Sequence, residues 1–206
     1  MLSLSSEREK IQVEDIMAKI SKYTGVTKLS QSDVVTPSNI VSDMIDLLPE
    51  EVFKPGITFF DPAVKSGRFL IGLFNRLMKS EYMIEEFLDD DNRKEYILDN
   101  QLFGLSTSEL AASITRKALY NEVLTHGNIV CVDQYPDIVK KIPLKDIVRK
   151  GFGKEMQFNV IIGNPPYNND IYLDFVTQSF HLSKDYTVMI TPAKWQAKGG
   201  GKEYII

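Results

Sequence analysis

The stretch that decides the fold runs from Phe158 to Tyr167 and has the sequence FNVIIGNPPY. It begins with apolar and β-branched residues, as is typical of a fully buried strand in a parallel sheet. The run ends at Asn164 and two prolines, which lack backbone donors and prevent the strand from continuing. We therefore expect a buried strand over 158–162 that ends at a functional edge.

The residues after this strand carry groups suited to binding an amino group on a planar ring. Asn164 offers a side-chain carbonyl and Pro165 a main-chain carbonyl, and both accept hydrogen bonds. Pro166 restricts the backbone, and Tyr167 adds a flat aromatic face. The alternative interpretation is a strand followed by a tight proline turn with a packed tyrosine.

Length and composition indicate one globular domain. The 206 residues, with 43% hydrophobic and 25% charged content, suffice for a sizeable core. No apolar run approaches the roughly 18 residues of a membrane span, and the first residues lack a signal-peptide core. One cysteine and two histidines provide neither a disulfide nor a metal cluster. We expect a cytoplasmic protein without membrane contact or structural metal.

The overall charge is weakly acidic, with a net charge of −4 and a pI near 5.3. Domains that bind nucleic acid by themselves usually present a basic face. The net charge therefore argues against tight DNA binding by this chain alone, although it leaves room for a local basic groove.

Apolar runs and helical spacings alternate along the chain. The runs predict strands over 57–60, 101–105, 128–132, 158–162 and 186–190. The spacings predict helices over 7–23, 37–48, 68–77, 82–100, 106–120 and 171–182, with a surface connection carrying a short helix over 135–155. This alternation predicts an α/β fold with a doubly wound, mainly parallel sheet and right-handed crossovers.

Two predicted helix starts carry specific signals. Thr36 and Pro37 suit the N-cap and the first helical position. Ser106 and Glu109 have the spacing of a capping box, with Ser106 as the N-cap.

We expect the three aspartates at 89–91 on a solvated helix surface.

The turn after the first predicted strand has the sequence DPAVKSGRFL, from Asp61 to Leu70. A strand, a turn of small residues and a helix place ligands at the carboxyl end of a parallel strand. The turn matches neither the GxGxxG pattern nor a Walker loop, so phosphate binding is not indicated. Asp61 is expected at the strand tip, and the alternative role for it is to cap the turn.

In their order and context, these blocks resemble the S-adenosylmethionine-dependent, adenine-specific DNA methyltransferases of restriction–modification systems. The resemblance is to the branch of this family in which the cofactor motifs precede the catalytic motif in the sequence. The matching blocks are Thr36-Pro37, Asp61 to Leu70, Asp133 after the third predicted strand, and Asn164 to Tyr167. A fifth block at 189–195 is similar to the strand and proline that follow in the type II subgroup. The resemblance covers roughly residues 34–204.

The resemblance implies a Rossmann-like sheet with helices on both faces, S-adenosylmethionine as cofactor and double-stranded DNA as partner. The target adenine would be flipped from the duplex and stacked on Tyr167. The catalytic motif would be Asn164, Pro165, Pro166 and Tyr167, with Asn164 and the Pro165 carbonyl accepting hydrogen bonds from the adenine amino group. The motif is less specific for DNA than for amino groups, so protein glutamine or RNA is the alternative substrate.

The resemblance also implies a set of cofactor-binding residues. Asp61 would face the methionine ammonium, Thr36 the methionine carboxylate and Asp133 the adenine amino group of the cofactor. Phe69 would line the pocket, and its alternative place is the ordinary core. The full set is Thr36, Asp61, Ala63, Ser66, Gly67, Phe69, Ser106, Glu109 and Asp133.

The sequence departs from the family pattern in two places. Val64 and Lys65 replace a cysteine and a glycine of the usual turn, and Lys65 puts a long cation where the backbone should approach the cofactor. Ser106 stands where many relatives have an acidic residue for the ribose, and Glu109 is a turn further on.

The third departure is length, because the chain stops soon after the fifth predicted strand. We therefore expect an N-terminal helical segment at 1–33 and a truncated catalytic domain at 34–206. The last antiparallel strands and the target-recognition domain would be absent. A fused or partner domain would then be needed to bind DNA or to cut it. The alternative is an inactive cofactor-binding fragment.

Overall fold

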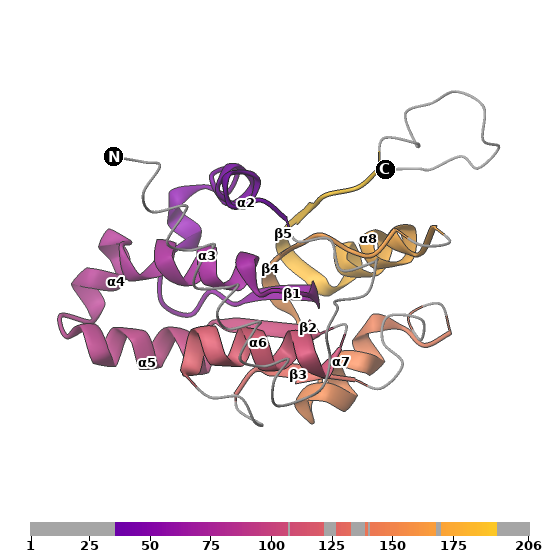
Figure 1. Ribbon diagram of the computed structural model, residues 1–206. Helices are drawn as coiled ribbons and strands as arrows, with labels where there is room; N and C mark the ends of the chain where they lie inside the picture. The colour runs from indigo at the N-terminus through magenta and orange to yellow at the C-terminus, as the bar shows by residue number, and fades with distance from the viewer. Residues whose placement is uncertain are drawn as a thin grey trace.

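A five-stranded, wholly parallel sheet forms the centre of the protein (Figure 1). The computed structural model describes residues 36–106, 108–121, 127–132, 139, 141–167 and 170–192. The strands are β1 (Phe59–Val64), β2 (Leu102–Ser106), β3 (Ile129–Cys131), β4 (Phe158–Gly163) and β5 (Ser183–Met189). Their order in the sheet is β3-β2-β1-β4-β5, so the predicted doubly wound parallel sheet is confirmed.

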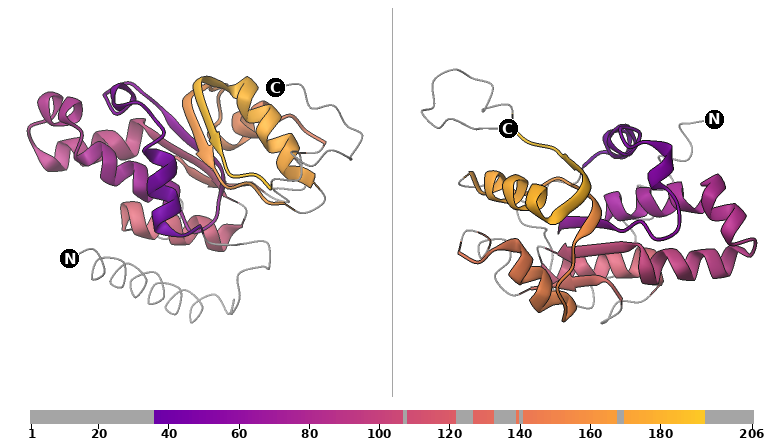
Figure 2. Two further views of the ribbon diagram at one scale, coloured as in Figure 1. Left: turned by 90° about the horizontal axis from the view of Figure 1, so that it is seen from above. Right: turned by 180° about the vertical axis from the view of Figure 1, so that it is seen from behind.

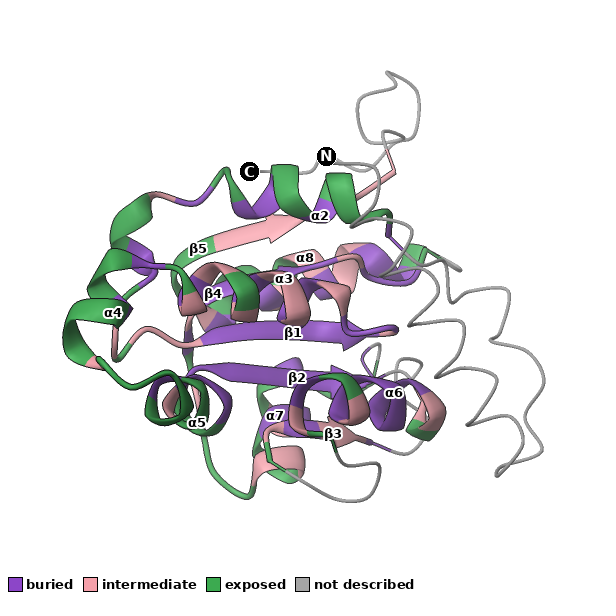
Figure 3. Ribbon diagram, turned by 60° about the vertical axis from the view of Figure 1, so that its left-hand side comes forward, coloured by how far each residue is buried: buried purple, intermediate pink, exposed green. Residues whose placement is uncertain are grey.

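Helices cover both faces of this sheet (Figures 2 and 3). The helices are α2 (Ser38–Ile45), the 3-10 turn η1 (Glu50–Val52), α3 (Arg68–Met78), α4 (Glu81–Glu86), α5 (Asp90–Asn100), α6 (Glu109–Tyr120), α7 (Leu144–Phe152) and α8 (Ile171–Leu182). Residues of α2, α3, α5 and α6 share one apolar core, and residues of α7 and α8 share another. The sheet is therefore the middle of three layers.

The apolar runs form buried strands because consecutive side chains serve opposite cores. Phe59 and Phe60 of β1 are both fully buried, one in each core. The Phe60 ring stacks on Phe158 of β4, with ring centroids 4.3 Å apart. Burial of each such side chain contributes roughly 2 kcal/mol.

The predicted helix starts are wrong in their details. Pro37 is the N-cap of α2, and the helix start has no side-chain cap, because the Thr36 hydroxyl bonds elsewhere. Ser108 rather than Ser106 caps α6, accepting from the Ala111 N–H at 3.2 Å. Ser106 is the last residue of β2.

Two further predictions are corrected by local contacts. The single helix expected over 82–100 is two helices, because the Asp89 side chain caps α5 by accepting from the Asn92 N–H at 2.9 Å. Asp61 lies inside β1 rather than at its tip, since pairing with β2 continues to Val64 across an irregular register.

The remaining predictions about individual elements can be compared directly with the structure. β4 and α8 form where expected, and α7 is the short helix of the connection over 135–155. The helix predicted at 7–23 and the residue Asp133 lie outside the described residues. Within the described ranges, no helix has both the length and the apolar character needed to cross a membrane.

Gly67 joins β1 to α3 and is required for two reasons. It is the N-cap of α3 with φ of +73°, in the left-handed region that favours glycine. A Cβ at this position would also lie 2.6 Å from Cγ2 of Thr115 on α6. The turn below the candidate site therefore depends on the absence of a side chain.

Gly67→Ala is expected to lower the free energy of unfolding by about 3 kcal/mol, because left-handed strain and overpacking add together. Gly153→Ala is the matched control, because Gly153 has φ of +72° but a Cβ there would have no neighbouring atom within 4 Å. The control should lose only about 1 kcal/mol in urea unfolding. Equal losses would show that Thr115 does not restrict the turn.

Candidate functional site

The candidate site lies between β1 and β4. From β1, the chain adds β2 and β3 on one side of the sheet and β4 and β5 on the other, so the topological switch point of the sheet lies there. All five strands are parallel, so their carboxyl ends meet at one edge of the sheet (Figure 3). In open α/β sheets, ligands bind at this edge and at this switch point. Residues 65–67 follow β1 there, and the motif from Asn164 to Tyr167 follows β4.

Asp61 is a buried carboxylate beside this switch point, with 2% of its surface exposed. It accepts a hydrogen bond from the Ala63 N–H at 2.9 Å. Burial raises the pKa of Asp61 from 3.8 to about 7, against the opposing effects of that hydrogen bond and of the Lys65 charge. The carboxylate therefore bonds the backbone two residues further along its own strand, and a cation beside it would offset the cost of its burial.

Gly163, the last residue of β4, is a site residue that the sequence reasoning missed. A Cβ there would lie 2.8 Å from Oδ1 of Asp61. Glycine is therefore needed for the buried carboxylate to fit against the neighbouring strand. The signal was present in the sequence, because a glycine at the end of an apolar strand often marks a close approach.

The Asn164 side chain is held between two hydroxyl groups. Its Nδ2 donates to Oγ1 of Thr36 at 3.1 Å, and its Oδ1 accepts from the Tyr167 hydroxyl at 2.7 Å. The Tyr167 hydroxyl also lies 3.4 Å from the Ile190 carbonyl oxygen, just after β5. These contacts join α2, β4 and β5 at one edge.

Tyr167 is positioned as an accessible ring. It is 41% exposed, while Pro165 and Pro166 before it are buried. Its ring meets Tyr172 of α8 edge-on, with centroids 6.0 Å apart. Burial raises the pKa of the Tyr167 hydroxyl, which therefore remains a donor at neutral pH.

A small hollow collects most of the predicted site residues. Its lining is formed by Thr36, Asp61, Ala63, Lys65, Ser66, Gly67, Arg68, Phe69 and Asn164. Phe69 is also 4% exposed within the core around α3, so it both lines the hollow and belongs to the core. Lys65 lines the hollow, in keeping with its place in the sequence, and Arg68 is a second cation that the sequence reasoning did not predict.

Two described residues of the predicted cofactor set do not line this hollow. Ser106 is fully buried, and its hydroxyl donates to the Ser108 carbonyl at 2.7 Å and lies 3.3 Å from the Val64 carbonyl. Glu109 is exposed and pairs with Arg116 at 2.7 Å. Asp133 lies outside the described residues.

Comparison with known proteins assigns the chain to a family. Residues 100–205 match the family described as Eco57I restriction-modification methylase. The chain belongs to this family. The match contains the motif from Asn164 to Tyr167, and it confirms the resemblance seen in the sequence.

Individual relatives of the methylase are distant. An uncharacterized adenine-specific methylase of Mycoplasma pneumoniae is 24% identical over an alignment of 247 residues, which covers 82% of this chain and 57% of the relative. The methylase thus spans little more than half of that protein.

Two solved structures extend the comparison. The M protein of the type I restriction enzyme EcoKI shares 15% identity at a TM-score of 0.50, over 75% of this chain and 32% of that one. A SAM-dependent O-methyltransferase of Thermotoga maritima shares 13% identity at a TM-score of 0.43, over 88% and 51%. The EcoKI likeness supports the fold of the methylase.

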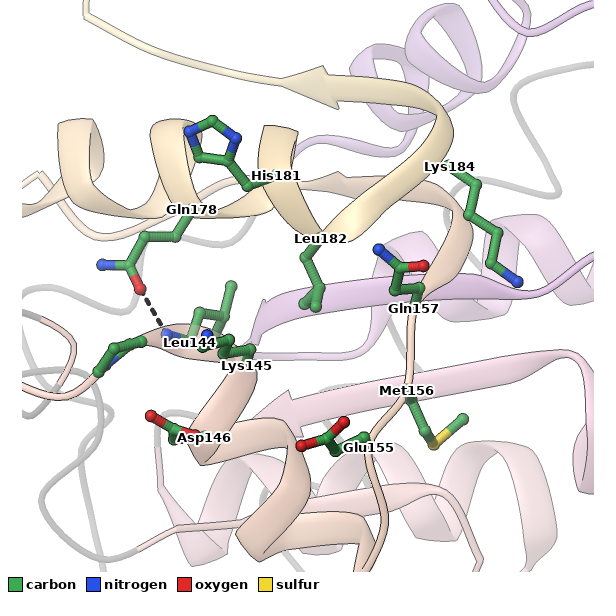
Figure 4. A pocket seen from close by; sticks show the side chains of 11 residues that line it. Leu144, Lys145, Asp146, Glu155, Met156, Gln157, Gln178, His181, Leu182 and Lys184 are labelled. Carbon is green, nitrogen blue, oxygen red and sulfur yellow. Dashed lines mark hydrogen bonds between the residues drawn. The ribbon is translucent and has the colours of Figure 1, made fainter.

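A much larger hollow of about 730 Å³ lies between residues of α7, α8 and the start of β5 (Figure 4). It is formed where α7 begins and where α8 gives way to β5, and Gln178 of α8 accepts there from the Leu144 N–H. It borders the starts of β4 and β5 rather than their ends, and it contains none of the predicted site residues. We therefore place the chemistry at the smaller hollow.

Asp61→Asn should make the methylase more stable at alkaline pH. Between about pH 4 and 7 the folded state keeps a proton on Asp61 that the unfolded chain has released, so wild-type stability falls as pH rises and the penalty is complete above pH 7. The variant should exceed the wild type by on the order of 4 kcal/mol at about pH 8 and equal it near pH 4.

Urea unfolding at a series of pH values measures this difference. Asparagine can still accept from the Ala63 N–H, so the substitution changes the charge and leaves the hydrogen bond. A stability difference that does not vary with pH would contradict the burial argument.

Proposed function

We propose that this chain is the catalytic part of a restriction–modification DNA methyltransferase. It transfers a methyl group from S-adenosylmethionine to the exocyclic amino group of adenine in double-stranded DNA. The observation that carries the proposal is the Asn164 amide, held at the switch point beside the buried Asp61 in a member of a methylase family.

The motif acts on the amino group by accepting hydrogen bonds. Oδ1 of Asn164 and the Pro165 carbonyl bind the two N–H groups, which directs the nitrogen lone pair away from them. The exposed Tyr167 ring supplies a face on which a flipped adenine stacks. Much of the acceleration then comes from positioning, with no side-chain base required.

The residues around Asp61 fit S-adenosylmethionine, which supplies an electrophilic methyl group when bound. A buried carboxylate with a pKa of about 7 favours a neighbouring cation, and the methionine ammonium provides one. The start of α2 has no side-chain cap, so its free N–H groups suit the methionine carboxylate beside Thr36.

The remaining cofactor residues follow from their place at the hollow. Ala63, Ser66 and Gly67 form its backbone wall, and Phe69 its apolar wall. We keep Asp133 for the adenine amino group of the cofactor. Ser106 and Glu109 are not proposed to bind the cofactor, because their polar groups already bond within the fold.

DNA is the proposed partner, and the acidic chain needs help to hold it. A net charge of −4 supplies little general attraction for phosphates. We therefore propose that a fused or partner target-recognition domain grips the duplex in the cytoplasm, while this chain contributes the cofactor site and the amine clamp.

Transfer of tritium from labelled S-adenosylmethionine to unmethylated duplex DNA tests the proposal, with the chain alone and with its target-recognition partner. Asn164→Ala should lower the transfer rate by about 100-fold or more, because the amine loses its acceptor. Asn159→Ala is the matched control, since Asn159 lies at the opposite end of β4 and bonds Thr58 there.

The substrates in this assay decide between the alternatives. Full activity of Asn164→Ala would refute the role of the motif. Transfer to RNA or to a release-factor protein, with none to DNA, would replace the proposed substrate.

Calorimetry with S-adenosylhomocysteine tests the cofactor site separately. Because Asp61 must lose its proton to face the ammonium, the affinity at about pH 5.5 should be roughly 20-fold lower than at about pH 7.5. Asp61→Asn should bind weakly at both values. A folded chain that releases no heat would be an inert fragment.

A further inference from the structure

The Thr36 hydroxyl contacts the catalytic motif from another part of the chain. Thr36 is 7% exposed and lies just before α2, whose N-cap is Pro37. Threonines at helix starts usually bond the helix backbone, but this helix start has no side-chain cap. The hydroxyl instead accepts from Nδ2 of Asn164 at 3.1 Å.

This contact matters because an asparagine amide has two ends of nearly equal size and opposite chemistry. Its oxygen accepts hydrogen bonds and its nitrogen donates them. An amino group of the substrate needs the oxygen. With Nδ2 on Thr36, Oδ1 turns toward Tyr167, where the adenine ring is proposed to stack.

We propose that Thr36 is a positioning residue that sets the orientation of the Asn164 amide and couples it to the bound cofactor. The inference rests on the proposed function, because it assigns Asn164 Oδ1 to the substrate amine. Thr36 itself touches no reacting atom.

The coupling follows from the single hydrogen of a hydroxyl group. When the Thr36 hydroxyl donates that hydrogen to the methionine carboxylate, its oxygen has only lone pairs to offer Asn164. The amide must then present Nδ2 to Thr36 and Oδ1 to the substrate. Without that carboxylate, the hydroxyl can act as donor or acceptor toward Asn164, so Thr36 alone no longer fixes the orientation of the amide.

Tyr167 completes this arrangement in the absence of substrate. Its hydroxyl donates to Oδ1 of Asn164 at 2.7 Å, in the place that a substrate N–H would take. The acceptor therefore stays satisfied until the adenine amine replaces the hydroxyl. The Ile190 carbonyl, 3.4 Å away, is a second acceptor for the displaced hydroxyl.

Thr36→Val and Thr36→Ser test the proposal, because valine keeps the shape and loses the hydroxyl while serine keeps the hydroxyl. Thr58→Val is the matched control, since Thr58 forms the corresponding threonine–asparagine pair with Asn159 at the other ends of β1 and β4. At saturating S-adenosylmethionine, Thr36→Val should lower kcat for DNA about tenfold. Thr36→Ser should recover most of this loss, and Thr58→Val should leave kcat unchanged.

A readout without catalysis accompanies the kinetics. The side-chain amide signals of Asn164, assigned in ¹⁵N-labelled full chain by their loss in Asn164→Ala, should shift in Thr36→Val. S-adenosylhomocysteine should shift them in the wild type and in Thr36→Ser, and should leave them in place in Thr36→Val.

The two failures are distinguishable. A wild type that transfers no methyl group to any substrate overturns the proposed function, and with it this assignment of Oδ1. A wild type that methylates DNA, with kcat and amide signals of Thr36→Val unchanged from it, overturns the positioning role alone.

Discussion

The burial of the Asp61 carboxylate between two strands of a parallel sheet is the constraint on which the rest of the structure depends. Desolvation disfavours the charged form, and the fold opposes this with one backbone hydrogen bond and the Lys65 charge. Space for the carboxylate exists only because Gly163 has no side chain. Stacked aromatic rings such as Phe60 and Phe158 stabilise the same two strands and offset the cost.

The two ends of the central strand pair are organised differently. At the amino ends, Thr58 and Asn159 satisfy each other's polar groups between β1 and β4. At the carboxyl ends, Asn164 reaches Thr36 and Tyr167, and its carbonyl oxygen lies beside an exposed ring. The first arrangement closes the sheet, whereas the second presents an exchangeable acceptor.

The sequence was informative wherever local chemistry decides the structure. The apolar run before Asn164 and the two prolines after it were enough to predict β4 and the edge where the site lies. The turn at Gly67 was likewise visible as a strand, small residues and a helix. These features depend on neighbours in the chain, so the pattern of residues carries them.

The errors arose where distant groups compete for a side chain. Thr36 has the right chemistry for an N-cap, but its hydroxyl accepts from the Asn164 amide instead. Ser106 has the spacing of a capping box, but it is the last residue of β2 and bonds the carbonyls of Val64 and Ser108. Glu109 pairs with Arg116 two turns along α6. No local pattern shows which partner wins.

The contact between Thr36 and Asn164 joins residues 128 positions apart in the chain. Closing a loop of that length costs about 4 kcal/mol of chain entropy, whereas one hydrogen bond returns about 1 kcal/mol. The bond therefore forms only because α2 already lies on α3. That docking is close at Gly72, where a Cβ would lie 2.7 Å from Cδ1 of Ile45. The orientation of an amide in the site thus depends on a missing methyl group in a helix interface.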